Sequence, residues 1–139
     1  MSDTIYPRSP RETMAGWVYL PRLVDKVRLH LAGKLHPDYQ ENFTKGFDGQ
    51  WLTAAGVSAE EFIYVVKNST TDGEVCDWVA RHVKKSDAEK AAFRDKILNA
   101  GRQPESQARL QWRKEQSGLQ HRDDIQTFVD YIDADEKRI

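Results

Sequence analysis

The sequence predicts an all-α protein: a compact single-domain bundle of six to seven short helices, preceded by an extended Pro/Arg-rich N-terminal segment. Two observations support this fold class. Apolar residues recur at the i, i+3, i+4, i+7 spacing of a buried helix face, and capping signals mark where helices begin and end. Sustained strand-like alternation is missing from the sequence. The short β-branched run at residues 62–66 follows a capping box, so it is interpreted as helix.

The length and composition suit one small domain. With 139 residues the chain can bury its own core, so a single domain over residues 1–139 is expected. The single cysteine, Cys76, cannot form an internal disulfide, which favours a reducing compartment. No apolar run approaches the about 18 residues of a membrane helix. Asp3, Pro7 and Arg8 interrupt the stretch where a signal peptide needs an apolar core, so we expect a cytoplasmic protein without membrane contact.

The first segment, residues 1–11, is predicted to lie extended across the bundle. Pro7 and Pro10 fix φ near −65° and disfavour helix in the residue before each of them. A short helical turn is predicted over residues 12–17.

The clearest predicted helix covers residues 20–32 and ends at Gly33. Its buried face is formed by Leu20, Leu23, Val24, Val27 and Leu31. The opposite face is charged, but it also carries Leu29. A leucine inside a compact cluster of charges indicates that this second face is covered too, and the extended N-terminal segment is a candidate for covering it.

Capping signals bound the later helices. Ser58, Thr71 and Ser86 each stand three residues before a glutamate, so each can form a capping box. Glycines that suit C-terminal caps are Gly33, Gly56, Gly101 and Gly118. Pro104 suits a first helical turn. The helices predicted after Gly33 cover residues 48–55, 58–68, 72–84, 87–100, 104–117 and 124–133. The helix at 104–117 lacks a continuous apolar stripe, so we expect it to lie on the surface and to pack mainly through Trp112.

Charge is unevenly distributed although the net charge is only −1. Residues 1–36 carry six basic and three acidic side chains, whereas residues 119–139 carry three basic and six acidic ones. Complementary ends of one small domain are expected to bind each other. Two basic stripes remain, Arg81, Lys84, Lys85 and Arg109, Arg113, Lys114. They are interpreted as solvated helix faces, and no nucleic-acid partner is expected.

The strongest candidate for a site is the charged cluster near the start of the chain. Arg22 and Lys26 stand four residues apart on one helix, an unfavourable pair unless an anion lies between them. Asp25 can relieve Arg22 or Arg28. This arrangement is typical of a socket for a carboxylate or phosphate. The favoured alternative is that the chain's own acidic end fills the socket. The acidic residues that could do so are Asp133, Asp135 and Glu136.

Other chemistry-bearing residues give weaker signals. His82 is predicted to project from the apolar stripe of helix 72–84, either as a ligand or a tuned acid/base or, more commonly, as a core histidine. Cys76 is interpreted as inert because no positive charge lies at helical spacing from it. The sequence contains no metal-binding, cofactor or catalytic motif, so no metal and no cofactor are expected, and enzymatic activity stays undecided.

Several short motifs cover most of the chain. The opening ones are Pro7-Arg8-Ser9-Pro10-Arg11, Leu20-Pro21-Arg22, Asp25-Lys26, Arg28, Leu31-Ala32-Gly33 and Tyr39. The later ones are Leu52, Gly56, Thr71-Asp72, Glu74, Trp78, Asp124-Ile125, Phe128, Ile132-Asp133 and Asp135-Glu136. Together they resemble the pattern of an uncharacterised bacterial family, the domain of unknown function 5069. The resemblance implies a small cytoplasmic protein without assigned activity, cofactor or partner. Its recurring polar positions correspond here to Arg8, Arg11, Arg22, Asp25, Lys26, Tyr39 and Asp72.

Three functions follow as hypotheses. The first is a binding or regulatory module that accepts an anionic group at Arg8, Arg11, Arg22 and Lys26, with Asp25, Tyr39 and Asp72 as further candidate residues. The second is an enzyme acting on a small anionic metabolite. Its candidates for proton transfer are Asp25, Asp72, Tyr39 and His82. The third is a protein–protein adaptor or homodimer that uses Trp51 or Trp112 as an anchor. The expected partner is thus a small anion or a protein, and the chain is a monomer or homodimer.

Overall fold

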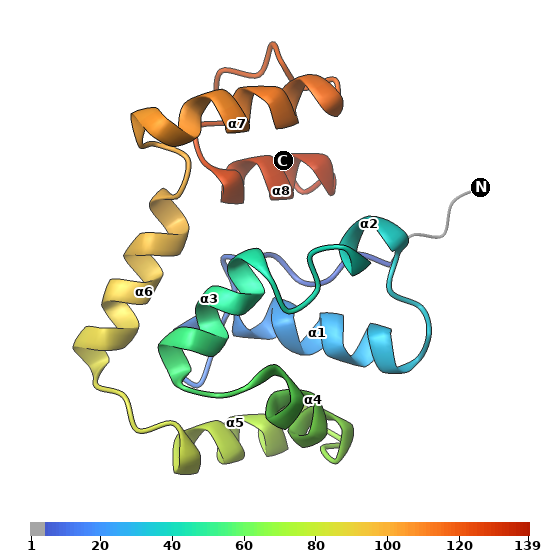
Figure 1. Ribbon diagram of the computed structural model, residues 1–139, viewed down its shortest axis with the longest axis vertical. Helices are drawn as coiled ribbons and strands as arrows, with labels where there is room; N and C mark the ends of the chain where they lie inside the picture. The colour runs from blue at the N-terminus through green and yellow to red at the C-terminus, as the bar shows by residue number, and fades with distance from the viewer. Residues whose placement is uncertain (1–4) are drawn as a thin grey trace.

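Helices dominate the computed structural model, which describes residues 5–139 (Figure 1). Within that range the helices are α1 (Leu20–Leu31), α2 (Pro37–Gln40), α3 (Gly46–Ala55), α4 (Ala59–Lys67), α5 (Asp72–His82), α6 (Asp87–Asn99), α7 (Pro104–Gln116) and α8 (Phe128–Asp135). The predicted all-α class is confirmed. None of the described helices is long and apolar enough to cross a membrane.

A small β-hairpin replaces the helical turn predicted over residues 12–17. Strands β1 (Thr13–Met14) and β2 (Trp17–Val18) pair antiparallel, with Met14 opposite Trp17. The two residues between them, Ala15 and Gly16, have φ values of 52° and 81°. Positive φ at both central residues is the geometry of the two-residue turns that match strand twist, so the hairpin is locally favoured.

Local capping chemistry sets most helix boundaries as predicted. The hydroxyls of Ser58, Thr71 and Ser86 each accept a hydrogen bond from the backbone N–H three residues later. Of the three predicted capping boxes, only the one at Ser86 is complete, with the Glu89 carboxylate also accepting from the Ser86 N–H. The apolar run at residues 62–66 lies in α4, as expected. The last helix begins later than the predicted residue 124, because the Thr127 hydroxyl accepts from the Asp130 N–H at 3.0 Å and caps α8 there. The four-residue α2 was not predicted.

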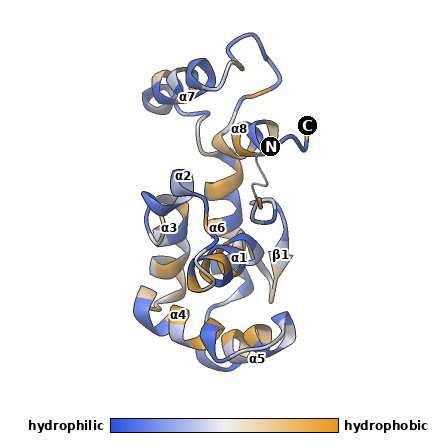
Figure 2. Ribbon diagram, turned by 90° about the vertical axis from the view of Figure 1, so that its right-hand side faces the viewer, coloured by the Kyte–Doolittle hydropathy of each residue, from blue (hydrophilic) through white to orange (hydrophobic). Residues whose placement is uncertain are grey.

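The main apolar core surrounds α1, which Figure 2 shows near the centre of the molecule with α4 and α5 on one side and α7 and α8 on the other. Trp17 and Trp51 meet edge to face in this core, with ring centroids 5.9 Å apart. Trp51 is 0% exposed. Its predicted role as a surface anchor is therefore wrong, because the indole is needed to fill the core.

Both faces of α1 are covered, as the position of Leu29 indicated. The predicted apolar face is buried except for Leu31, which is 44% exposed at the end of the helix. On the charged face, Arg22 and Lys26 are also buried. The N-terminal segment crosses this face, where the Arg8 N–H donates to Asp25 at 2.8 Å and the Arg22 guanidinium donates to the Arg8 carbonyl at 3.2 Å. Residues 1–4 of the predicted extended segment lie outside the described residues.

Helices α7 and α8 form a second, smaller apolar cluster around Leu110, Ile125 and Ala134. Trp112 is 55% exposed, so the prediction that this helix packs through Trp112 is wrong. The helix packs through Leu110 instead, and Lys114 is buried with its Nζ donating to the Arg122 carbonyl at 2.8 Å. Helix α6 runs along one side of the molecule and connects the α4–α5 end to the α7–α8 pair (Figure 1).

Gly101 positions this pair and gives the first testable prediction. Its φ is +106°, and a Cβ there would lie 3.1 Å from the Phe128 nitrogen and 3.2 Å from the Thr127 Cα. We expect Gly101→Ala to lower the free energy of unfolding by about 2–3 kcal/mol, measured by urea denaturation. Gly118→Ala is the matched control, because Gly118 also has a positive φ but nothing lies within 4 Å of its Cβ position. Gly118→Ala should lower the free energy of unfolding by only about 1 kcal/mol. Equal losses would contradict the steric account.

Candidate functional site

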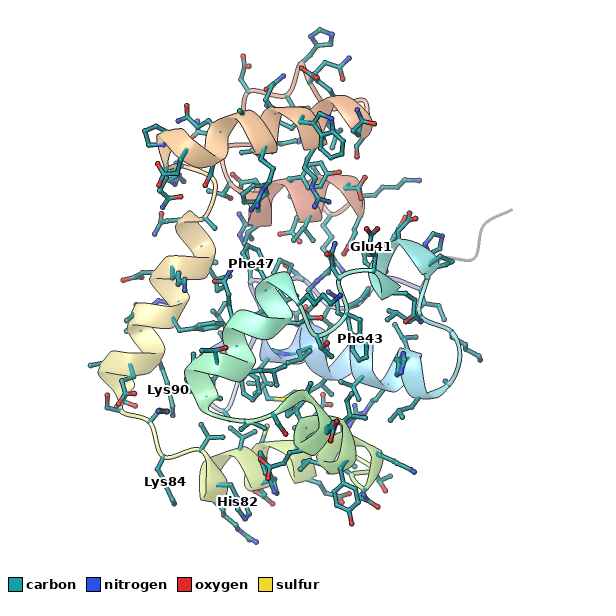
Figure 3. All side chains as sticks on the ribbon, in the orientation of Figure 1. Glu41, Phe43, Phe47, His82, Lys84 and Lys90 are labelled. Atoms are coloured by element: carbon teal, nitrogen blue, oxygen red, sulfur yellow. The ribbon has the colours of Figure 1, made fainter. Side chains whose placement is uncertain are left out.

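A cleft of about 490 Å³ lies between the α1–α3 part of the protein and the α7–α8 pair, a volume typical of small-molecule sites. The first wall includes Tyr19, Arg22, Lys26, Tyr39, Lys45 and Phe47. The second includes Arg109, Arg113, Phe128, Tyr131, Asp135 and Glu136. Figure 3 shows Phe47 at the end of α3 that faces α8. Three of the predicted site residues, Arg22, Lys26 and Tyr39, are thus brought together at this cleft.

The floor of the cleft contains a buried ion pair between Arg22 and Glu136. The guanidinium donates two hydrogen bonds, Nη1 to Oε1 at 2.9 Å and Nη2 to Oε2 at 2.7 Å. Tyr39 donates its hydroxyl to the same Oε2 at 2.7 Å, and Arg138 also donates to Glu136. The expectation that the acidic end of the chain fills the Arg22 socket is therefore confirmed, with Glu136 as the carboxylate.

The surroundings of Glu136 fix its protonation state. Burial opposes ionisation, but the hydrogen bonds from Arg22 and Tyr39 and the positive charge of Arg22 outweigh it, so the pKa of Glu136 lies below its usual value. Burial and the same hydrogen bond raise the pKa of Tyr39. Tyr39 is accordingly a protonated donor at neutral pH, which makes it unsuited to act as a general base.

A second buried group, Tyr19, Lys26 and Asp48, adjoins the first. Asp48 is completely buried, and its carboxylate accepts from the Lys26 Nζ at 3.2 Å and from the Tyr19 hydroxyl. Burial lowers the pKa of Lys26 more than the nearby Asp48 charge raises it. Tyr19 has a φ of 76°, a left-handed conformation that costs a bulky residue about 1–3 kcal/mol. Sequence reasoning missed Tyr19 and Asp48, because a buried Lys26 demands an acidic partner but does not identify which one.

The remaining predicted residues form ion pairs away from the cleft. Arg8 donates to both oxygens of Asp25 at 3.0 Å and to Asp72 at 2.9 Å, and Arg28 donates to Asp72 at 2.7 Å. Asp25 thus pairs with Arg8, and the prediction that it relieves Arg22 or Arg28 is wrong. Burial opposes ionisation of Asp72, but the hydrogen bonds from Arg8 and Arg28 outweigh it and lower its pKa. Arg11 pairs with Asp130 and Asp133 of α8. Arg8, Arg11, Asp25 and Asp72 do not line the cleft.

His82 and Cys76 are also remote from the cleft lining. His82 lies exposed at the end of α5 (Figure 3). Its ring stacks on Trp78, with the two ring centroids 4.8 Å apart. The interpretation of His82 as a core histidine is wrong, because the helix turns that side chain outward. Cys76 is half-buried, and burial raises the pKa of its thiol, which is the environment of an unreactive cysteine.

Three cations at the cleft have no acidic partner in the part of the chain that the structure describes: Lys45, Arg109 and Arg113. They contrast with Arg8, Arg11, Arg22, Lys26 and Arg28, all of which form ion pairs. The Arg109 guanidinium lies over the Phe128 ring, 4.9 Å from its centroid. Sequence reasoning placed Arg109 and Arg113 on a solvated stripe, and nothing in the sequence indicates that this stripe faces α3. In all, five cationic and three acidic side chains line the cleft, so its charge is positive.

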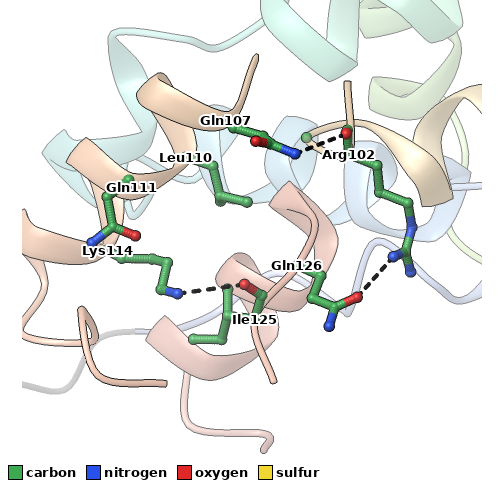
Figure 4. A pocket seen from close by; sticks show the side chains of 8 residues that line it. Arg102, Gln107, Leu110, Gln111, Lys114, Ile125 and Gln126 are labelled. Atoms are coloured by element: carbon green, nitrogen blue, oxygen red, sulfur yellow. Dashed lines mark hydrogen bonds between the residues drawn. The ribbon is translucent and has the colours of Figure 1, made fainter. Parts of the chain in front are cut away.

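A second, smaller cavity of about 360 Å³ lies between α7 and the segment before α8 (Figure 4). Its polar groups mostly satisfy one another. Gln107 donates to the Arg102 carbonyl, Arg102 donates to the Gln126 side chain, and Lys114 approaches the Ile125 carbonyl at 3.5 Å. The cleft is therefore the better candidate site. No group of three or more His, Cys, Asp or Glu residues within residues 5–139 is arranged to hold a metal ion.

Comparison with known proteins identifies the family. The model of the family described as "Domain of unknown function (DUF5069)" matches residues 4–138, so the chain belongs to this family. No curated protein matches the chain at a significant level. The description of the family names no activity, so we infer the function from the geometry of the cleft.

The Arg22–Glu136 pair yields a prediction about stability. Removing one partner leaves a buried charge uncompensated, which costs about 3–5 kcal/mol. We expect Glu136→Ala to lower the free energy of unfolding by this amount in urea denaturation. Asp124→Ala is the control, because the Arg122–Asp124 pair is exposed and its loss should change stability little. If the two substitutions lower the free energy of unfolding equally, the buried pair contributes no more to stability than the exposed one.

The lowered pKa of Glu136 predicts a pH dependence. A carboxyl with a depressed native pKa contributes stability that is fully present above its unfolded value of about 4.5 and is lost as the pH falls through the native value. The free energy of unfolding of wild type should therefore exceed that of Glu136→Gln by less at pH 3 than at pH 6. Urea denaturation of both proteins at the two pH values measures this. If the difference in free energy of unfolding between the two proteins is the same at both pH values, Glu136 does not titrate in this window.

Proposed function

We propose that this member of the DUF5069 family is a binding module that takes up a small anionic molecule in the cleft between α3 and the α7–α8 pair. The observation that supports this most directly is the presence of three cations, Lys45, Arg109 and Arg113, beside one cleft and without acidic partners among residues 5–139. Arg109 and Arg113 stand four residues apart on α7, and such like charges are unfavourable neighbours unless an anion lies between them.

The proposed site differs from the N-terminal cluster that the sequence favours. The cluster residues Arg8, Arg11 and Arg22 are occupied by the chain's own carboxylates, so an incoming anion would have to displace them. Arg22, Lys26 and Tyr39 keep a role as the floor of the cleft. The bound anion contacts Lys45, Arg109 and Arg113 directly. Arginine suits this role because its guanidinium can make bidentate contacts with a carboxylate or phosphate.

A binding role is favoured over the enzymatic alternative. Of the residues that the sequence suggests for proton transfer, Asp25, Asp72 and His82 do not line the cleft. Tyr39 lines it but has a raised pKa, which keeps the proton in place. Asp135 does line it, and partial burial raises the pKa of its carboxyl, so the enzymatic alternative now depends on this residue.

The adaptor alternative retains Trp112 as an exposed anchor but loses Trp51, which is buried. A measurement of molecular mass in solution would test the homodimer version of that alternative.

A thermal-shift screen of the full-length protein against anionic metabolites and nucleotides tests the proposal. A ligand at about 100 times its Kd stabilises the native state by about 2.7 kcal/mol, which raises Tm by several degrees. We expect at least one anion to give this shift with wild type and to lose it with Arg113→Gln.

The matched control is Arg81→Gln, because Arg81 is also an exposed arginine in the last turn of its helix but lies outside the cleft. This variant should respond to the anion as wild type does. The proposal fails if no anion shifts Tm, or if Arg113→Gln and Arg81→Gln respond alike.

A further inference from the structure

We infer that the molecule bound in the cleft is a nucleoside monophosphate, whose phosphate contacts the cations of α7 and whose base lies against the aromatic lining. This inference rests on the proposed function and names the ligand class of the same site. It draws on two features that a simple anion would leave unused, the aromatic rings and the acidic side chains of the cleft.

Four half-buried aromatic rings line the cleft: Tyr39, Phe47, Phe128 and Tyr131. Two of them are held in place by neighbours, since Tyr19 meets the Phe47 ring edge to face at 5.8 Å and Arg109 covers Phe128. Stacking of a base on an aromatic ring contributes about 1–3 kcal/mol, and an arginine plane can stack in the same way. Inorganic phosphate or a small dicarboxylate would contact the cations and leave this surface exposed to water.

The cleft also carries two carboxylates, Asp38 and Asp135, that form no ion pair with Lys45, Arg109 or Arg113. Carboxylates repel a polyanion, so they are unexpected in a site for a ligand that is charged throughout. They are good acceptors for neutral donors such as ribose hydroxyls and the exocyclic amines of bases. A ligand with one anionic end and one neutral, donor-rich end satisfies both parts of the lining.

The size and charge of the cleft set an upper limit on the ligand. A volume of about 490 Å³ suits a single small molecule. Nucleic-acid binding needs an extended positive groove and a basic domain, whereas the net charge of this chain is −1. The combination of phosphate, sugar and one planar base therefore fits the lining better than a polynucleotide.

Isothermal titration calorimetry of the full-length protein tests the inference with four kinds of probe: the common nucleoside monophosphates, ribose 5-phosphate, inorganic phosphate and an aromatic carboxylate. We expect at least one nucleoside monophosphate to bind about tenfold more tightly than ribose 5-phosphate, because only the former gains stacking. Phe47→Leu should remove most of this difference and leave the affinity for ribose 5-phosphate unchanged. Arg113→Gln should weaken both. Tyr64→Leu, which alters an exposed aromatic ring outside the cleft, is the control and should change neither.

The outcomes separate this inference from the proposed function. If ribose 5-phosphate or inorganic phosphate binds as tightly as every nucleoside monophosphate, the ligand class is wrong and anion binding stands. If only the aromatic carboxylate binds and Arg113→Gln weakens its binding, the ligand class is again wrong and anion binding again stands. If no probe binds, the inference fails, and if the wider anion screen is negative as well, the proposed function fails with it. The comparison between nucleotide and ribose 5-phosphate uses wild type alone, so it decides the question even if Phe47→Leu does not fold.

Discussion

The buried pairing of Arg22 with Glu136 is the interaction on which the rest of the structure depends. It joins α1, at the centre of the main core, to the residue that follows α8, and it satisfies two charges that would be very costly to bury alone. The same carboxylate accepts from Tyr39, which brings α2 to the cleft. The Glu136 carboxylate thereby links three elements from distant parts of the sequence and forms the floor between them.

Ionic contacts also link the part of the protein around the main core to the α7–α8 pair. The main core and the smaller α7–α8 cluster are separate, and the cleft opens between them. Besides Glu136, the contacts of Arg11 with Asp130 and Asp133 tie α8 to the N-terminal segment. Arg8 ties that segment in turn to α1 and α5 through Asp25 and Asp72. Helix α8 is thus held against the rest of the protein by ion pairs as well as by Val129, which is buried in the main core.

Local features of the fold could be predicted from the sequence, and long-range partners only in part. Capping hydroxyls such as Ser58 and Ser86 act within one helical turn, so the helix starts follow from nearby residues. The complementary charge of the chain ends correctly indicated that they bind each other. The partner of Lys26 could not be predicted, because many carboxylates were available and only the packing of α3 brings Asp48 beneath it. The position of Arg109 and Arg113 at the cleft could not be predicted either. Their spacing is that of a solvated helix face, and only the packing of α7 opposite α3 brings them to the cleft.

The separation of Arg22 and Glu136 by 114 residues has a consequence for how the protein acquires its structure during synthesis. Arg22 is synthesised before Glu136, and a contact of such high sequence separation forms late because loop closure is entropically costly. The guanidinium on α1 must therefore stay hydrated, or make a temporary contact, until the α8 segment has emerged. The buried residues of the main core precede α8, with Val129 as the exception, so most of this core can assemble earlier, whereas the cleft acquires its floor only when Glu136 reaches Arg22.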